Sequence, residues 1–211
     1  MSLTPTLILA YVFAIFIAYL MGSIPFAILV SRLFGLQDPR HFGSGNPGAT
    51  NVLRSGNKKA AILTLIGDAF KGWLAVFITS QFFVQDNLSI SLVAVAAFLG
   101  HVYSIFLGFK GGKGVATGIG VLLGLDPSLA LILIVIWLLV ALLFKYSSLA
   151  ALVAAASAPF LYLTLNFSSP SFSSEIFVAI AFISLFLIYK HKKNIHNLLI
   201  GKESKIGQKK K

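Results

Sequence analysis

Long apolar stretches alternate with short polar links along almost the whole chain of 211 residues. Seven apolar segments can be distinguished, at about 5–34, 60–84, 88–107, 113–125, 127–145, 147–166 and 173–190. Most reach the roughly 20 residues that a helix needs to cross the hydrocarbon core of a bilayer. The pattern predicts an all-α integral membrane protein with seven transmembrane helices. The segment 113–125 is short and rich in glycine, so it is either a tilted span that begins nearer Phe109 or a half-span.

Basic residues fall on alternate links, and this alternation predicts the topology. The links at 32–59, 108–114 and 145–147, with the tail from residue 190, contain every Lys and Arg except Lys71. The links near 85–89, at 125–127 and at 167–174 contain none. Since basic links remain in the cytoplasm, we expect the N-terminus outside and the C-terminus inside. The alternation fails if the fourth segment does not count as a span.

Composition agrees with a membrane protein and limits its chemistry. Hydrophobic residues make up 57% of the chain and charged residues 11%, whereas a soluble domain has about 25% charged residues. The chain has no cysteine, which excludes disulfides, thiolate metal sites and a cysteine nucleophile. The formal charge of +11 fits contact with anionic lipid and requires no nucleic acid. Because the links are short, we expect a single transmembrane domain over 1–211, with a cytoplasmic basic tail at about 191–211.

Two glycine-rich basic loops lie in links that the topology places on one side of the membrane. The first loop, residues 43–54, reads GSGNPGATNVLR, and the second loop, residues 110–114, reads KGGKG. Glycine lets backbone N–H groups approach an anion, while Lys and Arg supply the opposite charge. The loops therefore predict a site for phosphorylated molecules, although a turn-rich connector would have a similar composition. The candidate substrate-binding residues in these loops are Ser44, Gly45, Asn46, Gly48, Thr50, Asn51, Gly111, Gly112 and Gly114, with Arg54 and Lys113 as cations.

Neither loop is a nucleotide-binding loop of a familiar kind. The first loop fits G-x-G-x-x-G, but a membrane bundle lacks the βαβ unit that the dinucleotide fingerprint needs. The second loop follows Leu107 where a Walker A motif needs Gly, and Gly114 stands where that motif needs Ser or Thr.

Polar residues in or beside the spans supply further candidates. Asp68 and Lys71 lie three residues apart in the second segment, where an unpaired charge costs about 2.5–3.5 kcal/mol at the bilayer centre. They form either a salt bridge that shapes the pocket or part of the chemistry itself. His101 is expected to be a buried histidine that packs between helices. All three residues are therefore candidates for a structural role beside the site.

The end of the last apolar segment carries a third polar cluster. His191 and Asn194 are three residues apart and could face the same pocket as the two loops. The alternative is a basic belt whose long side chains face the lipid headgroups. Ser148, at the start of the sixth segment, could cap its helix or bind a ligand oxygen. The acids are too few and scattered for a carboxylate metal site, and no nucleophile motif is present, so an enzyme of this kind would need a substrate with a good leaving group.

These motifs resemble those of the bacterial acyl-phosphate-dependent glycerol-3-phosphate acyltransferases (the PlsY type). The first motif runs from Gly22-Ser23-Ile24-Pro25 through the first loop to Asp68 and Lys71-Gly72. The second runs from Gly100-His101 through the second loop to Thr117, and the third from His191 to Glu203. The similarity covers almost the whole chain. Ser104 and Asn197 stand where the family usually has a proline and a basic residue.

The resemblance implies transfer of an acyl group from acyl phosphate to the 1-hydroxyl of sn-glycerol 3-phosphate, the first step of phospholipid synthesis. The products would be 1-acyl-sn-glycerol 3-phosphate and inorganic phosphate, made at the cytoplasmic face of the bacterial inner membrane without cofactor or metal. The expected partners are the two substrates, membrane lipid and, by functional coupling, the enzyme that makes acyl phosphate. The expected catalytic residues are Lys113, Arg54, His191 and Asn194. The alternative is a small membrane transporter of phosphorylated solutes, which would share the anion-binding loops but would need a polar path to the outside.

Overall fold

The computed structural model describes residues 4–82, 86–170 and 172–207, and the regular elements in these ranges are helical. Of two short 3₁₀ turns, η1 (Pro39–His41) lies in a polar link and η2 (Ile105–Leu107) lies at the end of the third apolar segment. The end of the expected second span, at 83–84, and the end of the basic tail, at 208–211, lie outside the described ranges. The α-helices are α1 (Pro5–Ser23), α2 (Phe26–Leu33), α3 (Ala49–Leu53), α4 (Lys58–Phe82), α5 (Asn87–Val102), α6 (Val115–Leu125), α7 (Pro127–Phe144), α8 (Ser147–Asn166), α9 (Ser174–Lys190) and α10 (Lys192–Leu199).

Each predicted apolar segment contains a helix, but the helices differ in length. Five candidate spans are long and apolar enough to cross a membrane, with α1 and α2 counted together and α5 extended to Leu107. A sixth is obtained if α9 is joined to α10, which is bent from it by 56°. The helix α6 has 11 residues and is about 17 Å long. The structure therefore supports an integral membrane protein with five or six candidate spans, and the count of seven stays a prediction.

Helix boundaries follow local signals in the sequence. Pro25 follows the end of α1 and stands at the N-cap of α2, because proline cannot continue a helix from within it. Asp86 caps α5 by accepting from the Ser89 amide, and Asp126 caps α7 by accepting from the Leu129 amide. Such caps satisfy amides that the helix leaves without partners.

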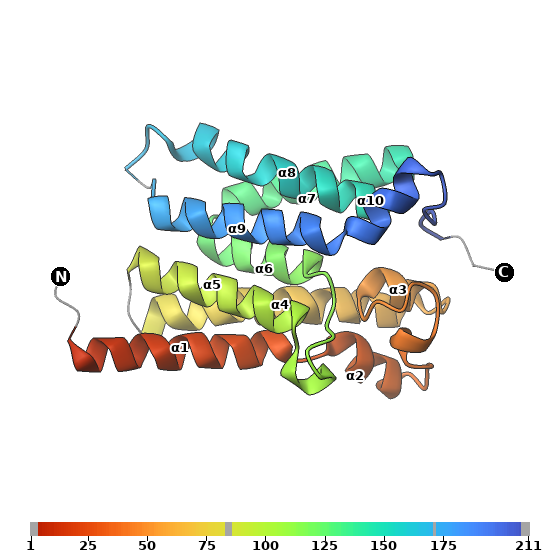
Figure 1. Ribbon diagram of the computed structural model, residues 1–211, viewed down its shortest axis with the longest axis horizontal. Coiled ribbons are helices and arrows are strands. Elements are labelled where there is room, and N and C mark those ends of the chain that lie inside the picture. Colours follow the sequence, from red (N-terminus) through yellow and green to blue (C-terminus); the bar gives the residue numbers. More distant parts are fainter. Residues whose placement is uncertain (1–3, 83–85, 171, 208–211) are drawn as a thin grey trace.

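The helices pack in two layers around α6 (Figure 1). One layer contains α1, α4 and α5, the other contains α7, α8 and α9, and α6 contacts members of both. Small residues allow the close approach of backbones that is common in membrane bundles. A methyl group on Gly120 would lie 1.8 Å from the Ala69 carbonyl oxygen, and one on Gly100 would lie 2.2 Å from that of Tyr19.

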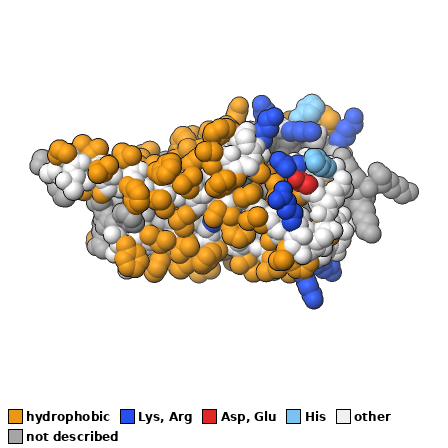
Figure 2. Space-filling model, turned by 90° about the horizontal axis from the view of Figure 1, so that it is seen from below, with side chains coloured by type: hydrophobic (Ala, Val, Ile, Leu, Met, Phe, Trp, Pro, Cys, Tyr) orange, Lys and Arg blue, Asp and Glu red, His pale blue; other side chains and the backbone are white. Residues whose placement is uncertain are grey.

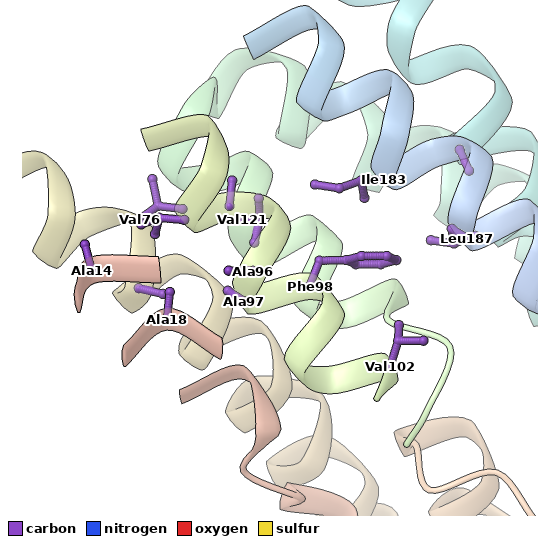
Figure 3. Close-up of a cluster of buried hydrophobic side chains, with 14 of the residues drawn as sticks. Ala14, Ala18, Val76, Ala96, Ala97, Phe98, Val102, Val121, Ile183 and Leu187 are labelled. Atoms are coloured by element: carbon purple, nitrogen blue, oxygen red, sulfur yellow. The ribbon is translucent and has the colours of Figure 1, made fainter. Parts of the chain in front are cut away.

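The buried core joins both layers (Figure 3). Alanines of α1 and α5 fill the contact between these helices, while Phe98 extends from α5 toward Ile183 and Leu187 of α9. The motif-bearing segments lie at one end of this bundle, where α2, α3 and α10 are found (Figure 1). On the face seen in Figure 2, hydrophobic side chains cover most of the surface, and Lys, Arg and His side chains gather toward that end. The bundle therefore has an apolar body and one charged end.

Candidate functional site

A chain of hydrogen bonds connects the second loop to the C-terminal segment. The Lys113 ammonium donates to the side-chain oxygen of Asn194, and the Asn194 amide donates to the Glu203 carboxylate at 2.7 Å. The same carboxylate oxygen accepts from the Ser148 hydroxyl at 2.6 Å. These bonds form one polar cluster from residues that are distant in sequence, Lys113, Ser148, Asn194 and Glu203.

Glu203 reaches this cluster because the chain turns back after α10. The amides of Lys202 and Glu203 both donate to the Asn197 carbonyl oxygen, at 2.8 and 3.1 Å. The Ile206 amide donates to the Lys145 carbonyl oxygen at 2.7 Å, which fixes the returning segment near the start of α8. Glu203 ends the third motif, but the sequence did not single it out as a site residue.

His191 lies at the bend between α9 and α10 and is 2% exposed. Its Nδ1 donates to the Leu187 carbonyl oxygen at 2.8 Å, which leaves Nε2 as the acceptor of the neutral ring. Burial lowers the pKa of His191 to about 4, and the Lys113 charge contributes to the decrease against the opposing effect of the Leu187 carbonyl. The imidazole is therefore neutral near pH 7 and can accept a hydrogen bond.

Lys113 lies in a group of positive charges. Burial lowers the pKa of Lys113 to about 8. The Glu203 carboxylate raises this pKa, whereas the charges of Arg54, Lys193 and Lys190 lower it further. These interactions place the first loop, the second loop and the α9–α10 region within electrostatic reach of one another. An anion bound here would relieve the repulsion among the cations, as expected for a phosphate site.

Asn51 holds the first loop in shape. Its side-chain amide donates to the carbonyl oxygens of Pro39 and Phe42, at 2.6 and 3.1 Å, and its oxygen accepts from the Ser44 amide at 2.9 Å. Gly43 has a positive φ of 60°, and a methyl group there would lie 2.2 Å from the Asn51 side-chain oxygen. The sequence suggested Asn51 as a substrate ligand, but in the structure its amide is engaged with the loop backbone.

The remaining candidates of the first loop are more open. Ser44, Gly45 and Thr50 are exposed, and Asn46 and Gly48 are half-buried. The Asn46 amide contacts the Ser44 hydroxyl at 3.4 Å, a distance too long for a strong hydrogen bond. The exposed side chains of this loop can therefore exchange water for a ligand at little cost.

The glycines of the second loop pack against the end of α5. The Gly111 and Gly112 amides donate to the carbonyl oxygens of Val102 and His101, both at 3.1 Å. A methyl group on Gly111 would lie 2.0 Å from the His101 carbonyl oxygen, and one on Gly112 would lie 2.3 Å from the His101 ring. Both amides were expected to bind phosphate, but the structure engages them with α5. Gly114 stands before α6 with no side-chain cap, so the first turn of α6 offers the amides that remain.

Asp68 and Lys71 form a buried salt bridge beneath the loops. Lys71 lies 2.7 Å from the Asp68 carboxylate and also donates to the Ile24 carbonyl oxygen at 2.7 Å. This oxygen lies at the break between α1 and α2 and also accepts from the Phe26 amide at 3.1 Å. His101 lies 3.4 Å from Asp68 and 3.0 Å from the Thr117 hydroxyl. Of the two alternatives left open by the sequence, the structure supports the salt bridge that shapes the pocket.

A cavity of about 10 Å³ adjoins this salt bridge and is lined in part by Pro47 of the first loop and Gly112 of the second. The buried ion pair therefore lies directly beneath the point where the two loops approach each other. Within the ranges that the structure describes, no group of three or more His, Asp and Glu residues is arranged to hold a metal ion.

Comparisons with known proteins agree on one family. A family model described as glycerol-3-phosphate acyltransferase matches residues 12–201. Proteins of that name from Bordetella petrii and Dechloromonas aromatica are each 58% identical to this chain, over 92% and 94% of its length and 92% and 97% of theirs. Two crystal structures of PlsY, an integral membrane glycerol 3-phosphate acyltransferase, are similar in fold. The glycerol 3-phosphate form has a TM-score of 0.86 and 38% identity over 93% of this chain and 96% of its own. The lysophosphatidic acid form has a TM-score of 0.84 and 36% identity over 93% and 95%.

Proposed function

Since the chain belongs to the glycerol-3-phosphate acyltransferase family, we propose that its polar cluster transfers an acyl group from acyl phosphate to the 1-hydroxyl of glycerol 3-phosphate. Acyl transfer to glycerol 3-phosphate is the activity of the family, and the chain is an enzyme of this class. The observation that carries the assignment of the site is the hydrogen-bonded chain Lys113–Asn194–Glu203–Ser148, since it joins the second motif to the third and to the start of α8.

The proposed reaction needs no covalent enzyme intermediate. The glycerol hydroxyl oxygen attacks the carbonyl carbon of acyl phosphate, an ester C–O bond forms, and the C–O bond to phosphate breaks. Phosphate departs with the bonding electron pair and is a good leaving group. The enzyme therefore has to hold two anions in line and stabilise the charge that develops on the carbonyl and phosphate oxygens.

The side chains and amides of the site divide between the two substrates. Lys113 and Arg54, whose charges act on each other, hold the phosphate of glycerol 3-phosphate together with Asn194 and Ser148. Acyl phosphate is bound by the amides of the first turn of α6 and by residues of the first loop, namely Ser44, Gly45, Asn46, Gly48 and Thr50. His191 accepts a hydrogen bond from the glycerol backbone through Nε2. Asn51, Gly111 and Gly112 shape the loops rather than touch substrate.

The attacking hydroxyl loses its proton to a substrate phosphate rather than to the protein. A phosphate monoester has a second pKa of about 6, while burial holds the pKa of His191 at about 4. The phosphate oxygen is thus the stronger base near pH 7. Glu203 is already engaged with Ser148 and Asn194, so it positions these side chains instead of accepting the proton.

Membrane topology follows from the same proposal. We place the charged end of the bundle in the cytoplasm of a bacterium, at the inner membrane, with the N-terminus outside. Seven crossings result if α6, although short, counts as the fourth span. This topology gives the site access to soluble glycerol 3-phosphate, and it permits coupling to the enzyme that supplies acyl phosphate. Family membership favours this reading over the transporter alternative.

A donor assay tests the proposed function. Purified protein is incubated with palmitoyl phosphate and glycerol 3-phosphate, and inorganic phosphate and lysophosphatidic acid are measured together. Equal release of both products, absent when palmitoyl-CoA replaces palmitoyl phosphate, is the expected result. Product formation from palmitoyl-CoA alone would contradict the proposed donor. No product from folded protein with either donor would overturn the assignment.

A further inference from the structure

His101 lies in the last turn of α5 and is 8% exposed. The hydrogen-bonded chain Lys113–Asn194–Glu203–Ser148 does not include it, and the proposed reaction uses neither of its ring nitrogens. A buried polar ring costs free energy unless its nitrogens find partners. The partners of His101 therefore indicate what this side chain does.

His101 contacts the chain on both sides of Lys113. Its backbone carbonyl oxygen accepts from the Gly112 amide at 3.1 Å, and a methyl group on Gly112 would lie 2.3 Å from its Nε2. Its Nδ1 lies 3.0 Å from the hydroxyl of Thr117, a fully buried residue in the first turn of α6. Since Lys113 stands between Gly112 and Thr117 in the chain, His101 fixes the backbone that precedes Lys113 and the helix that follows it.

A buried ion pair also faces the His101 ring. Nδ1 lies 3.4 Å from the Asp68 carboxylate, which in turn lies 2.7 Å from the Lys71 ammonium. Because a carboxylate only accepts hydrogen bonds, Asp68 favours the ring tautomer with its proton on Nδ1, and this N–H can donate to Thr117. Removing one member of a buried ion pair leaves an uncompensated charge and is strongly unfavourable. The ring is therefore anchored to α4 as well as to the first turn of α6.

Lys71 and Ser104 extend this anchor to the first motif. The Lys71 ammonium donates to the Ile24 carbonyl oxygen at 2.7 Å, at the break between α1 and α2. The hydroxyl of Ser104, a buried residue that follows α5, donates to the Ser23 carbonyl oxygen at the end of α1. The end of α5 is thus fixed to α4 and to the α1–α2 break before the chain enters the second loop.

Lys113 needs a rigid support of this kind. A lysine side chain is a flexible stem that carries a point charge, so its ammonium meets a substrate phosphate beside Asn194 only if its backbone is held at the right distance. In the structure this ammonium donates to Asn194 of α10. A displacement of about 1 Å in a group that positions substrate can cost about a hundredfold in rate.

We propose that His101 is a positioning residue, which holds the backbone on both sides of Lys113 so that this cation meets the phosphate of glycerol 3-phosphate. The role rests on the proposed function, in which Lys113 binds that phosphate. His101 touches neither substrate and acts through the second loop and the first turn of α6. The buried pair Asp68–Lys71 keeps its ring in place.

Thr117→Val tests this support with little change in shape, because valine replaces the hydroxyl by a methyl group. KM for glycerol 3-phosphate should rise about ten- to a hundredfold, as found for partners that orient metal ligands. KM for palmitoyl phosphate should change much less. The matched control is Thr79→Val, at a buried threonine of α4 whose hydroxyl donates to the Ala75 carbonyl oxygen of the same helix. The control should leave both KM values unchanged.

Two substitutions of His101 separate its polar contact from its packing. Asparagine carries an N–H at the position of Nδ1, whereas leucine is closer to histidine in volume but has no polar atom. His101→Asn should therefore keep KM for glycerol 3-phosphate nearer to the wild-type value than His101→Leu does. If the ring serves packing alone, the order of the two variants should be reversed.

A folding defect gives a different kinetic result, because partial loss of folded protein lowers the apparent kcat and leaves both KM values unchanged. An unchanged KM for glycerol 3-phosphate in Thr117→Val, or a better retained KM in His101→Leu than in His101→Asn, would overturn the positioning role. If the His101 variants do not fold, Thr117→Val decides alone. Such a result with active wild-type protein would leave the proposed function intact, whereas inactive wild-type protein would contradict the function itself.

Discussion

A methyl group added to Gly45 of the first loop would meet nothing closer than the Arg40 carbonyl oxygen at 3.5 Å, whereas one on Gly114 of the second loop would lie 2.3 Å from Phe98. The two loops look alike in sequence, since both combine glycine with basic residues at the ends of apolar segments. In the first loop glycine provides turns next to exposed side chains. In the second loop glycine allows backbone to pack against α5.

This difference shows that a glycine-rich basic loop can arise for two physical reasons. An anion cradle needs amides that point outward without a Cβ in the way. A close helix contact needs the same missing Cβ but uses its amides internally. In the second loop the Gly111 and Gly112 amides already have carbonyl partners. The contribution of that loop to substrate binding therefore falls mainly on Lys113, the lysine of the loop that lies in the polar cluster.

The largest effect is expected from Lys113→Ala. Turnover should fall by about a thousandfold, since the variant removes a cation that holds the phosphate of glycerol 3-phosphate in position for attack on the acyl carbon. The melting temperature should change little, because the cluster is left with less internal repulsion. Rates and thermal unfolding of Lys113→Ala are compared with those of Lys59→Ala, an exposed lysine at the start of α4. A stable Lys113→Ala protein with full activity would remove this residue from the site.

Substitution of one glycine in each loop separates packing from binding. Gly114→Ala combines a left-handed φ of 84° with a methyl clash against Phe98, and should cost about 3 kcal/mol of folding free energy. Gly45→Ala meets only the unfavourable φ of 70°, and should cost about 1–2 kcal/mol. Thermal unfolding in detergent measures both. Equal destabilisation by the two variants would argue that the loops do not differ in packing.

Asn51→Ala tests whether the first loop is held from within. The variant loses three hydrogen bonds to the Pro39 and Phe42 carbonyl oxygens and the Ser44 amide. We expect kcat/KM to fall about ten- to a hundredfold through loss of loop order, by analogy with partners that orient ligating residues. The neighbouring exposed residue Thr50 provides the comparison. If Thr50→Ala loses more activity than Asn51→Ala, direct contact with substrate outweighs loop shape.

The sequence was sufficient to locate the helices but not to distinguish the two loops. Apolar length predicted the outer bounds of the helical segments to within a few residues, but not the break at Ile24 and Pro25 that divides the first segment into α1 and α2. The spacing of Asp68 and Lys71 predicted that they could pair. The engagement of the Gly111 and Gly112 amides depends on where α5 ends relative to the second loop, which no local pattern contains. Glu203 reaches Ser148 only because the chain turns back after α10. Tertiary contacts of this kind have no signature in hydropathy or charge.

The smallest expected effect concerns pH, and it tests whether Lys113 acts as a charge. Burial lowers the pKa of Lys113 from 10.5 to about 8, so the free enzyme carries this cation below pH 8 and loses it above. Since kcat/KM reports groups of the free enzyme, kcat/KM for glycerol 3-phosphate should fall about tenfold per pH unit above this value. In kcat the decline should begin at higher pH, because a bound phosphate dianion stabilises the ammonium.

Lys113→Arg provides the control for this pH profile. Arginine remains charged at every pH that proteins tolerate, so the decline above pH 8 should disappear from whatever activity the variant retains. Persistence of the same decline in Lys113→Arg would assign it to another group. In that case the second loop would contribute packing alone, and anion binding would fall to the first loop with Arg54.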